Sequence, residues 1–232
     1  MPMTSTALDI ARLGGTTMGT TWSVSLVAPR QRDLHPLHAG IQARLDEVVA
    51  QMSTWEAGSD LSRYNRADAG RYCVLPAETR HVLACAQAIA AASGGAFDPT
   101  IGPLVALWGF GAHAGARRAP DATTLQAARA RCGWQHLHWQ DDALLQPGGL
   151  ELDLSAIAKG FGVDHVAAWL RSQGVDAALI EVGGELAGYG RKPDGQPWRV
   201  LVESAPEEDA HTDDVLDRFQ RLAVESVALL LT

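Results

Sequence analysis

The hydrophobic positions along the chain repeat with two different periods, and each period predicts one type of element. Residues 21–28, TWSVSLVA, alternate between apolar and polar side chains and stop at Pro29, a pattern typical of a half-buried β-strand. From Leu37 to Met52 the apolar residues recur every three or four positions. This spacing places them on one face of a helix, so an amphipathic helix is expected there.

Turn and cap residues delimit the middle of the chain. Pro76 opens a second helix and Gly94–Gly95 ends it, because proline favours the first helical turn and glycine favours the position after the last one. A third helix begins near Asp121, and a short hairpin is expected within residues 136–154. The stretch over residues 57–70 is rich in Gly, Ser, Asp and Asn, which predicts a loop.

The last third of the chain alternates between apolar elements and turns. Its predicted elements are a helix capped by Ser155 and closed by Gly174, a long strand over 176–190, a turn over 192–197, a returning strand over 198–203 and a surface loop over 205–219. The sequence ends in the apolar run RLAVESVALLLT. Such a run predicts either a last strand of the sheet or a fold that continues beyond residue 232.

Composition narrows the class of protein. The chain has 232 residues, of which 47% are hydrophobic and 20% charged, enough for a substantial core. We expect one structural unit over residues 1–232, an α+β fold with a mixed β-sheet and packed helices. The net charge of −8 and the lack of a long Lys/Arg run argue against a nucleic-acid partner.

The sequence gives weaker signals for the cellular location of the protein and for disulfide bonds or zinc binding. The three cysteines form no CxxC pair, which predicts neither a disulfide framework nor a zinc site. The sequence holds no apolar stretch long enough for a membrane span, and its N-terminus lacks the basic and apolar regions of a signal peptide. The chain as written is therefore expected to be cytoplasmic, or to have lost a targeting segment.

Lys159 is the residue whose position conflicts most with the pattern around it. It shares one helical stripe with Val163, Val166 and Leu170, which should face the core, and it opposes the helix dipole in the first turn. Two nearby glycines add further cost to the helix. One interpretation is an anion site built from Lys159 and the helix N-terminus. The other is that Lys159 pairs with Asp153 and extends from a half-buried helix.

Aromatic residues mark two weaker candidates. The irregular stretch over residues 96–111 carries Phe97, Trp108 and Phe110, which would either line a flat pocket for an aromatic ligand or pack in the core. Trp55 and Tyr64 flank a polar loop that is suited to stacking on a ring.

Several common motifs are absent from the sequence. It contains no GxGxxG at a helix start, no GxxxxGK[ST], no HExxH and no GxSxG, which excludes the usual dinucleotide, P-loop, zinc-protease and serine-hydrolase signatures. His136 and His138 are expected on one face of a strand, but two imidazoles do not make a metal site.

Five blocks in order give the sequence a specific resemblance. TTMGTTWSV, MSTWEAGSDLSRYN, GGAFDPTIGPLVALWGFG, LDLSAIAKGFGVDHV and ALIEVGGELAGYGRKPDGQPWRVLVE resemble the FAD:protein FMN transferases, a flavin transferase family formerly described as thiamine-biosynthesis lipoproteins. The blocks spread over most of the chain.

The resemblance implies a function and a set of site residues. Members of this family use FAD and Mg²⁺, transfer FMN to a threonine or serine hydroxyl of a target flavoprotein such as a membrane redox-complex subunit, and release AMP. The FAD contacts implied for this chain are Met18, Trp55, Ala96, Phe97, Asp98, Asp153 and Lys159. Lys159 and Asp153 would be the catalytic residues, and the backbone carbonyl of Ala156 would be a magnesium ligand.

The sequence also departs from the family pattern. The family continues beyond the position of residue 232 with further metal ligands, so we expect a C-terminally truncated member whose activity is in question. Two alternatives follow: an FAD pyrophosphatase that produces FMN and AMP, or a flavin-binding remnant without catalysis. Many relatives act in the periplasm or are anchored to a membrane, which is the alternative to a cytoplasmic location.

Overall fold

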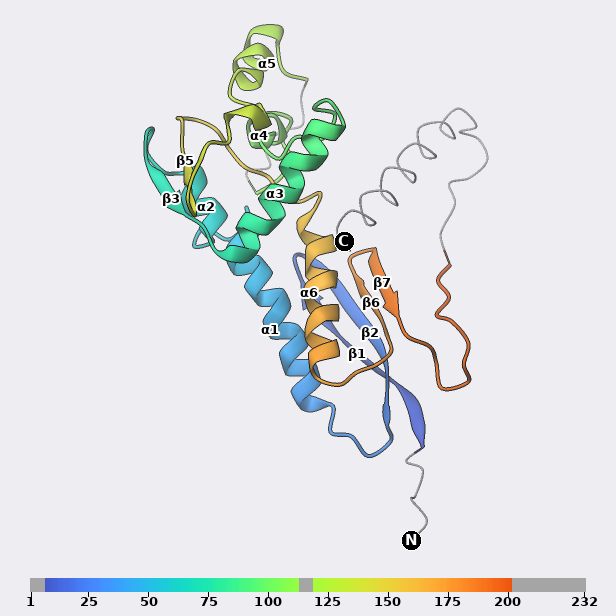
Figure 1. Cartoon of the computed structure of the whole chain (residues 1–232). Coiled ribbons are helices and arrows are strands. Elements are labelled where there is room, and N and C mark those ends of the chain that lie inside the picture. Colours follow the sequence, from blue (N-terminus) through green and yellow to red (C-terminus); the bar gives the residue numbers. More distant parts are fainter. Residues whose placement is uncertain (1–6, 113–118, 202–232) are drawn as a thin grey trace, which may run out of the picture. The chain divides into compact units, whose positions relative to one another are not determined.

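The computed structural model describes residues 7–112 and 119–201, and one compact unit within it ends at Trp198. That unit contains an antiparallel four-stranded sheet, a smaller three-stranded sheet and the helices that pack on them (Figure 1).

The larger sheet has the strand order β1-β2-β6-β7. Its strands are β1 (Leu8–Thr17), β2 (Thr20–Pro29), β6 (Ala178–Val182) and β7 (Glu185–Tyr189), and every neighbouring pair is antiparallel. The alternation in β2 has the expected consequence, because Trp22, Val24 and Leu26 are buried while the residues between them face the other side.

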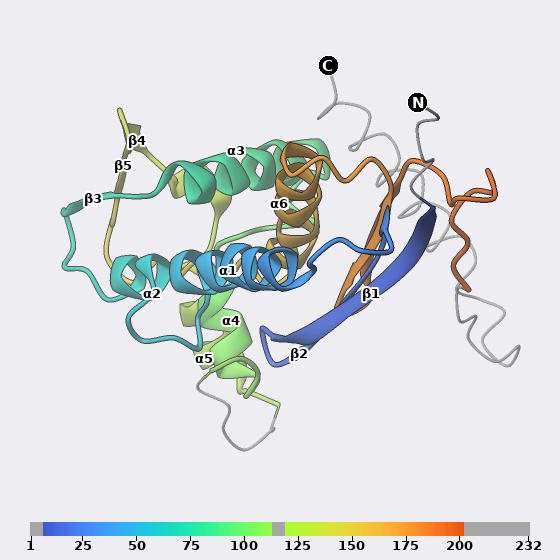
Figure 2. The same ribbon diagram turned by 90° about the horizontal axis from the view of Figure 1, so that it is seen from below.

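Two helices cover the inner face of this sheet. Helices α1 (His35–Met52) and α6 (Ala158–Ser172) lie side by side against it in both views (Figures 1 and 2). The apolar stripes of both helices and the inner residues of β2 and β6 form one buried core, which includes Leu37, Ile41, Leu45, Val163, Val166 and Leu170. The removal of these apolar side chains from water is the main source of stability for such a layer.

A second core lies under the smaller sheet. Its residues come from α2 (Asp60–Asn65), α3 (Ala77–Ala92) and the strands β3 (Tyr72–Val74), β4 (Trp139–Gln140) and β5 (Ala143–Leu145), whose order is β3-β5-β4, and also from the end of α1 and from residues 150–158. Met18, in the turn between β1 and β2, packs against both cores. The candidate functional site lies where these cores meet.

Three short elements complete the described part of the chain. These are α4 (Gly102–Leu107), α5 (Ala122–Arg129) and the 3-10 turn η1 (Trp134–His136). An isolated parallel bridge joins Ile101 to Glu151. In the described residues no helix combines the length and hydrophobicity that a membrane crossing requires.

The strongly periodic predictions are confirmed. The strand over 21–28, the helix from 37 to 52, the helix after Pro76 and the helix after Asp121 are present, and the 136–154 segment contains the β4–β5 hairpin. The α+β class is confirmed, but the sheets are not mixed as predicted: every pairing between the described strands is antiparallel, and the parallel contact of Ile101 with Glu151 is an isolated bridge.

Other predictions are wrong, each for a local reason. The 57–70 segment contains α2, whose N-terminus is capped by Ser59. The predicted single strand over 176–190 is the β6–β7 hairpin, because Gly183 and Gly184 both adopt positive φ and reverse the chain. Helix α6 begins at Ala158 with Ile157 at the N-cap, so Ser155 does not cap it.

The end of the described chain also differs from expectation. Residues Trp198–Leu201 contain no strand, and the rest of the predicted strand lies outside the described residues. The predicted loop over 205–219 and the final apolar run also lie outside them.

Candidate functional site

Two tight turns meet at one end of the larger sheet, beside the start of α6. The β1–β2 turn has Met18 (φ 49°) and Gly19 (φ 71°) at its centre, and the β6–β7 turn has Gly183 (φ 54°) and Gly184 (φ 94°). Because β2 and β6 are neighbours, the Gly183 N–H reaches the Thr21 carbonyl at 3.1 Å. The pairing of β2 with β6 therefore brings the β1–β2 turn and the β6–β7 turn together, although they lie far apart in the sequence.

Met18 occupies a backbone conformation that favours Gly or Asn. Only Met18 and Asp141 among the described non-glycine residues have positive φ, and such a conformation costs on the order of 1 kcal/mol. The Met18 side chain lies over Gly162 of α6, where an added Cβ would be 3.4 Å from the Met18 Cε. An unusual backbone at a cavity wall is consistent with a functional role for the side chain.

Lys159 lies at this junction and contacts the β6–β7 turn. Its Nζ donates a hydrogen bond to the Gly183 carbonyl at 3.1 Å and lies 3.8 Å from the Glu185 Oε1. Its side chain is 35% exposed. The alternative pairing of Lys159 with Asp153 is therefore not the one that the structure shows, whereas its shared stripe with the buried Val163 and Leu170 is confirmed.

Lysine is rare in this protein, so an ammonium group at the edge of a cavity is unusual for this chain. The sequence contains 17 arginines but only two lysines, Lys159 and Lys192. The ammonium of lysine acts on a phosphate as a compact point charge on a flexible side chain, whereas the planar guanidinium of arginine forms paired hydrogen bonds of fixed geometry.

The turn before α6 is ordered by Asp153. The Ser155 N–H donates to the Asp153 Oδ1 at 2.8 Å, and the N–H groups of Ile157 and Ala158 both donate to the Leu154 carbonyl. Ala156 is exposed within this turn, and no residue in the described chain donates a hydrogen bond to its carbonyl oxygen.

A cavity of about 600 Å³ opens beside Lys159, and we call it the lysine cavity. Trp55 forms part of its wall, and 67% of the surface of this residue is exposed. The cavity combines an apolar floor, an exposed aromatic ring and one cation at its edge. It is lined by Met18, Gly19, Val48, Val49, Met52, Ser53, Thr54, Trp55, Glu56, Ser155, Ala158 and Lys159.

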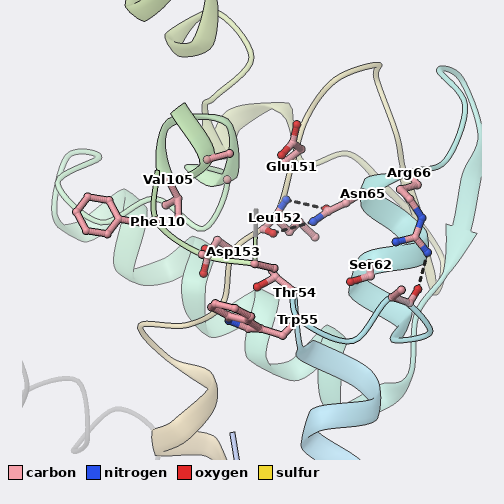
Figure 3. Close-up of a pocket in the computed structure, with 15 residues that line it drawn as sticks. Thr54, Trp55, Ser62, Asn65, Arg66, Val105, Phe110, Glu151, Leu152 and Asp153 are labelled. Atoms are coloured by element: carbon pink, nitrogen blue, oxygen red, sulfur yellow. Dashed lines mark hydrogen bonds between the residues drawn. The ribbon is translucent and has the colours of Figure 1, made fainter. Parts of the chain in front are cut away.

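A second cavity of about 430 Å³ shares Thr54 and Trp55 with the first, and we call it the carboxylate cavity (Figure 3). Asp153 and Glu151 supply two carboxyl groups, and Val105 and Phe110 supply apolar surface. Its remaining lining residues are Ala57, Ser62, Asn65, Arg66, Gly102, Ala106, Gly111, Ala112 and Leu152.

The loop that carries Trp55 is held by the N-terminal turn of α2. The Ser53 Oγ accepts hydrogen bonds from the Trp55 and Glu56 N–H groups, and the buried hydroxyls of Ser59 and Ser62 both donate to the Ser53 carbonyl. Because the backbone is fixed in this way, the indole can remain exposed without the loop losing its position.

The segment Ala96–Asp98 is placed differently from the other predicted FAD contacts. None of its residues lines either cavity. The Asp98 carboxylate accepts hydrogen bonds from the Thr100 N–H and hydroxyl and from the Trp134 N–H. The adjacent Pro99 carbonyl accepts the Asp153 N–H at 2.9 Å. Asp98 thus fixes the backbone that supports Asp153.

The structure places the aromatic residues singled out in the sequence in different environments. Trp108 and Phe110 are exposed, so neither is an ordinary core residue, but only Phe110 lines a cavity. Tyr64 is buried in the second core, and this burial raises the pKa of its phenol. His136 lies in η1 and not on a strand with His138, so the two imidazoles do not share a strand face.

The structure adds residues that the sequence analysis did not identify. Gly183 and Glu185 contact Lys159, and Asn65 and Arg66 line the carboxylate cavity. The glycine pair before Glu185 is a usable signal, because two adjacent glycines between apolar runs are typical of a hairpin turn.

A magnesium site is not complete in the described residues. Mg²⁺ requires a near-octahedral set of oxygen ligands, usually with one or two carboxylates. Within residues 7–112 and 119–201, no group of three or more His, Cys, Asp or Glu side chains is suitable for a metal ion. The exposed Ala156 carbonyl alone does not fit such a requirement.

Comparisons with known proteins identify the class and then the family. The fold superimposes on a flavin transferase of Vibrio cholerae with a TM-score of 0.81 and 38% identity over 85% of this chain and 65% of that one. A flavinyl transferase of Pseudomonas stutzeri in its apo form gives a TM-score of 0.80 and 39% identity over 85% of this chain and 66% of that one. The sequence profile of the ApbE family matches residues 18–229, so the chain belongs to the ApbE family.

Curated relatives carry one description. The FAD:protein FMN transferase of Vibrio cholerae serotype O1 is 37% identical over 207 residues, 88% of this chain and 62% of the relative. The FAD:protein FMN transferase of Klebsiella pneumoniae strain 342 is 35% identical over 219 residues, 92% of this chain and 61% of the relative. The chain therefore spans about three fifths of the length of these relatives.

Proposed function

We propose that this protein binds FAD and transfers its FMN part to a hydroxyl group of an acceptor protein, with release of AMP. The observation that carries the proposal is the position of Lys159, a partly exposed ammonium at the edge of a cavity whose wall includes the exposed Trp55. A flavin dinucleotide presents aromatic rings joined by a diphosphate, and these two features match an indole and a cation placed at one cavity. The names of the curated relatives support the same reaction.

The proposed roles of the protein groups follow from their chemistry. Lys159 neutralises charge on the diphosphate, Trp55 and Met18 contact a ring of the dinucleotide, and Asp153 accepts hydrogen bonds from it across the carboxylate cavity. Ala96, Phe97 and Asp98 act through the backbone that supports Asp153. Positioning and charge neutralisation are the main requirements of phosphoryl-group transfer.

The transfer step itself needs no nucleophile from this chain. The acceptor hydroxyl oxygen, from threonine or serine, forms a bond to the phosphorus of the FMN part. The diphosphate P–O bond breaks, AMP leaves with the bridging oxygen, and the hydroxyl proton passes to solvent. The family resemblance implies Mg²⁺ with Ala156 as a ligand, and the described residues do not complete that site. The dependence of the transfer on Mg²⁺ therefore has to be measured.

Two alternatives use the same cavity. Attack by water in place of the acceptor hydroxyl would make the protein an FAD pyrophosphatase. Retention of intact FAD would make it a binding protein.

One assay separates these functions. The chain is incubated with FAD over a range of Mg²⁺ concentrations, with and without an acceptor peptide that contains threonine or serine. Mass spectrometry of the peptide and chromatography of FMN and AMP are the readouts. FMN on the peptide with an equal amount of AMP supports transfer. FMN and AMP that form without acceptor indicate hydrolysis, and bound FAD that stays intact indicates a binding protein. A chain that neither binds nor converts FAD contradicts the proposal.

A further inference from the structure

Among the described residues, Glu185 is the acidic side chain that forms an ion pair with the proposed phosphate-binding ammonium. The Glu185 Oε1 lies 3.8 Å from the Lys159 Nζ, beyond ordinary hydrogen-bond length, while the Gly183 carbonyl accepts a hydrogen bond from the same Nζ at 3.1 Å. The carbonyl therefore fixes the position of the ammonium, and the carboxylate interacts with it mainly through charge.

The β6–β7 turn is built to hold these two acceptors in place. Gly183 has no Cβ, and an added one would lie 2.6 Å from the Thr20 Cγ2 and 3.4 Å from the Lys159 Cδ. The Gly184 N–H donates to the Glu181 Oε1 at 2.7 Å, which closes the turn. Glu181 and Glu185 thus have different tasks, since Glu181 stabilises the turn and Glu185 faces the ammonium.

An anion that approaches Lys159 must compete with Glu185. The Glu185 side chain is 51% exposed, so it can turn into solvent at little cost once its partner is taken. An ammonium has three donors, and the Gly183 carbonyl uses one of them. A diphosphate carries more negative charge than one carboxylate and can accept the other two hydrogen bonds.

We propose that Glu185 is the resting counter-ion of Lys159 and that the phosphate groups of the nucleotide displace it. This inference rests on the proposed function for the identity of the nucleotide. The Gly183 carbonyl keeps the ammonium at the cavity edge in both states. Glu185 thereby sets the affinity for phosphate-bearing ligands, and ligands without phosphate are indifferent to it.

The binding test compares Glu185→Gln with the wild-type full chain. The dissociation constant of the Glu185→Gln variant for FAD at low ionic strength should be about two- to five-fold lower than that of wild type, the range expected for an exposed ion pair. The difference should shrink as salt is added, because screening weakens the Glu185 charge. The affinity for riboflavin, which has no phosphate, should stay the same. Asp9→Asn is the matched control, because it removes one charge from an exposed pair with Arg30 and should change neither affinity.

An independent readout uses the scarcity of lysine. A chain labelled with ¹³C at the lysine Cε gives two side-chain signals, from Lys159 and Lys192. Glu185→Gln and the addition of inorganic pyrophosphate should each move the Lys159 signal and leave the Lys192 signal in place. Lys192→Arg assigns the two signals.

The outcomes distinguish this inference from the proposed function. If the Lys159 signal does not respond to Glu185→Gln, the counter-ion contact is absent and the inference fails, whether or not FAD binds. If wild-type chain binds FAD and Glu185→Gln leaves that affinity unchanged or weakens it, Glu185 does not compete with phosphate and the inference is again wrong. If the Lys159 signal responds to Glu185→Gln and to pyrophosphate but FAD does not bind, the counter-ion role holds and the proposed function fails.

Discussion

The side chain of Asn65 makes both backbone hydrogen bonds of Leu152. Its Nδ2 donates to the Leu152 carbonyl at 2.9 Å, and its Oδ1 accepts the Leu152 N–H at 2.8 Å. Leu152 is buried and immediately precedes Asp153, so this amide joins the end of α2 to the segment that carries the proposed site carboxylate (Figure 3).

We expect Asn65→Ala to lower the free energy of unfolding by about 2 kcal/mol, because it leaves a buried N–H and a buried carbonyl without partners. Asn65→Asp should be at least as harmful at pH 7, since it places a carboxylate oxygen against the Leu152 carbonyl. At low pH the introduced carboxyl group is protonated and can donate a hydrogen bond to that carbonyl, so part of the loss should be recovered. Urea titrations of both variants test this, and a change below about 0.5 kcal/mol for Asn65→Ala would show that the pair contributes little.

The contact between α1 and α6 depends on the absence of a side chain at Gly40. An added Cβ would lie 2.0 Å from the Trp169 Cζ2, which is far inside van der Waals contact. Gly40→Ala should therefore destabilise the protein by about 1–3 kcal/mol through overpacking. Gly58→Ala is the matched control because nothing lies within 4 Å of its added Cβ. Equal unfolding midpoints for the two variants would contradict the close packing of these helices.

Two other glycines should respond to alanine with opposite signs. Gly19 has φ 71° and Gly160 lies in α6 with ordinary φ, and at both positions an added Cβ meets nothing within 4 Å. Gly19→Ala should cost on the order of 1 kcal/mol through backbone strain. Gly160→Ala should increase stability by about 0.5–1 kcal/mol because alanine favours the helix. Thermal unfolding of the free protein is the measurement, and a shared sign would contradict the turn assignment.

Glu78 gives the stability a defined pH dependence. Hydrogen bonds from its own backbone N–H and from the Gln51 amide lower the pKa of its carboxyl, which lies in the first turn of α3. A lowered folded-state pKa gives stability that is present above the unfolded-state pKa of about 4.3 and is lost as the pH falls through the folded-state value. Glu78→Gln should therefore be less stable than wild type at pH 7, and the difference should narrow below about pH 4. A difference that is constant from about pH 7 to about pH 3 would exclude this origin.

The sequence predicts those elements whose signal is repeated over many residues. The stripe of α1 and the alternation of β2 each contain several apolar positions with one period, and both elements form as expected. Helix α2 has only six residues, and its polar cap residues look like those of a loop. The β6–β7 hairpin resembles one strand in the sequence because apolar residues continue on both sides of Gly183–Gly184.

In the candidate site, too, some features can be predicted from the sequence and others cannot. Lys159 can be identified from sequence because a cation and glycines in a helix start violate local preferences together. Glu185 cannot, since its distance from Lys159 depends on a hairpin and on the pairing of β6 with β2. The placement of Asp98 likewise depends on Trp134, 36 residues away, whose N–H binds its carboxylate. Contacts of this kind arise only when the fold is formed.

The central claim is that Lys159 binds the phosphates of FAD at the lysine cavity, and its most direct test is the FAD affinity of Lys159→Ala. Lys192→Ala is the matched control, since it removes the other lysine of the chain. Loss of a charge-assisted hydrogen bond to phosphate should raise the dissociation constant for FAD by about ten-fold or more in Lys159→Ala, with riboflavin binding unchanged and Lys192→Ala equal to wild type. An FAD affinity in Lys159→Ala equal to that of wild type would contradict the account.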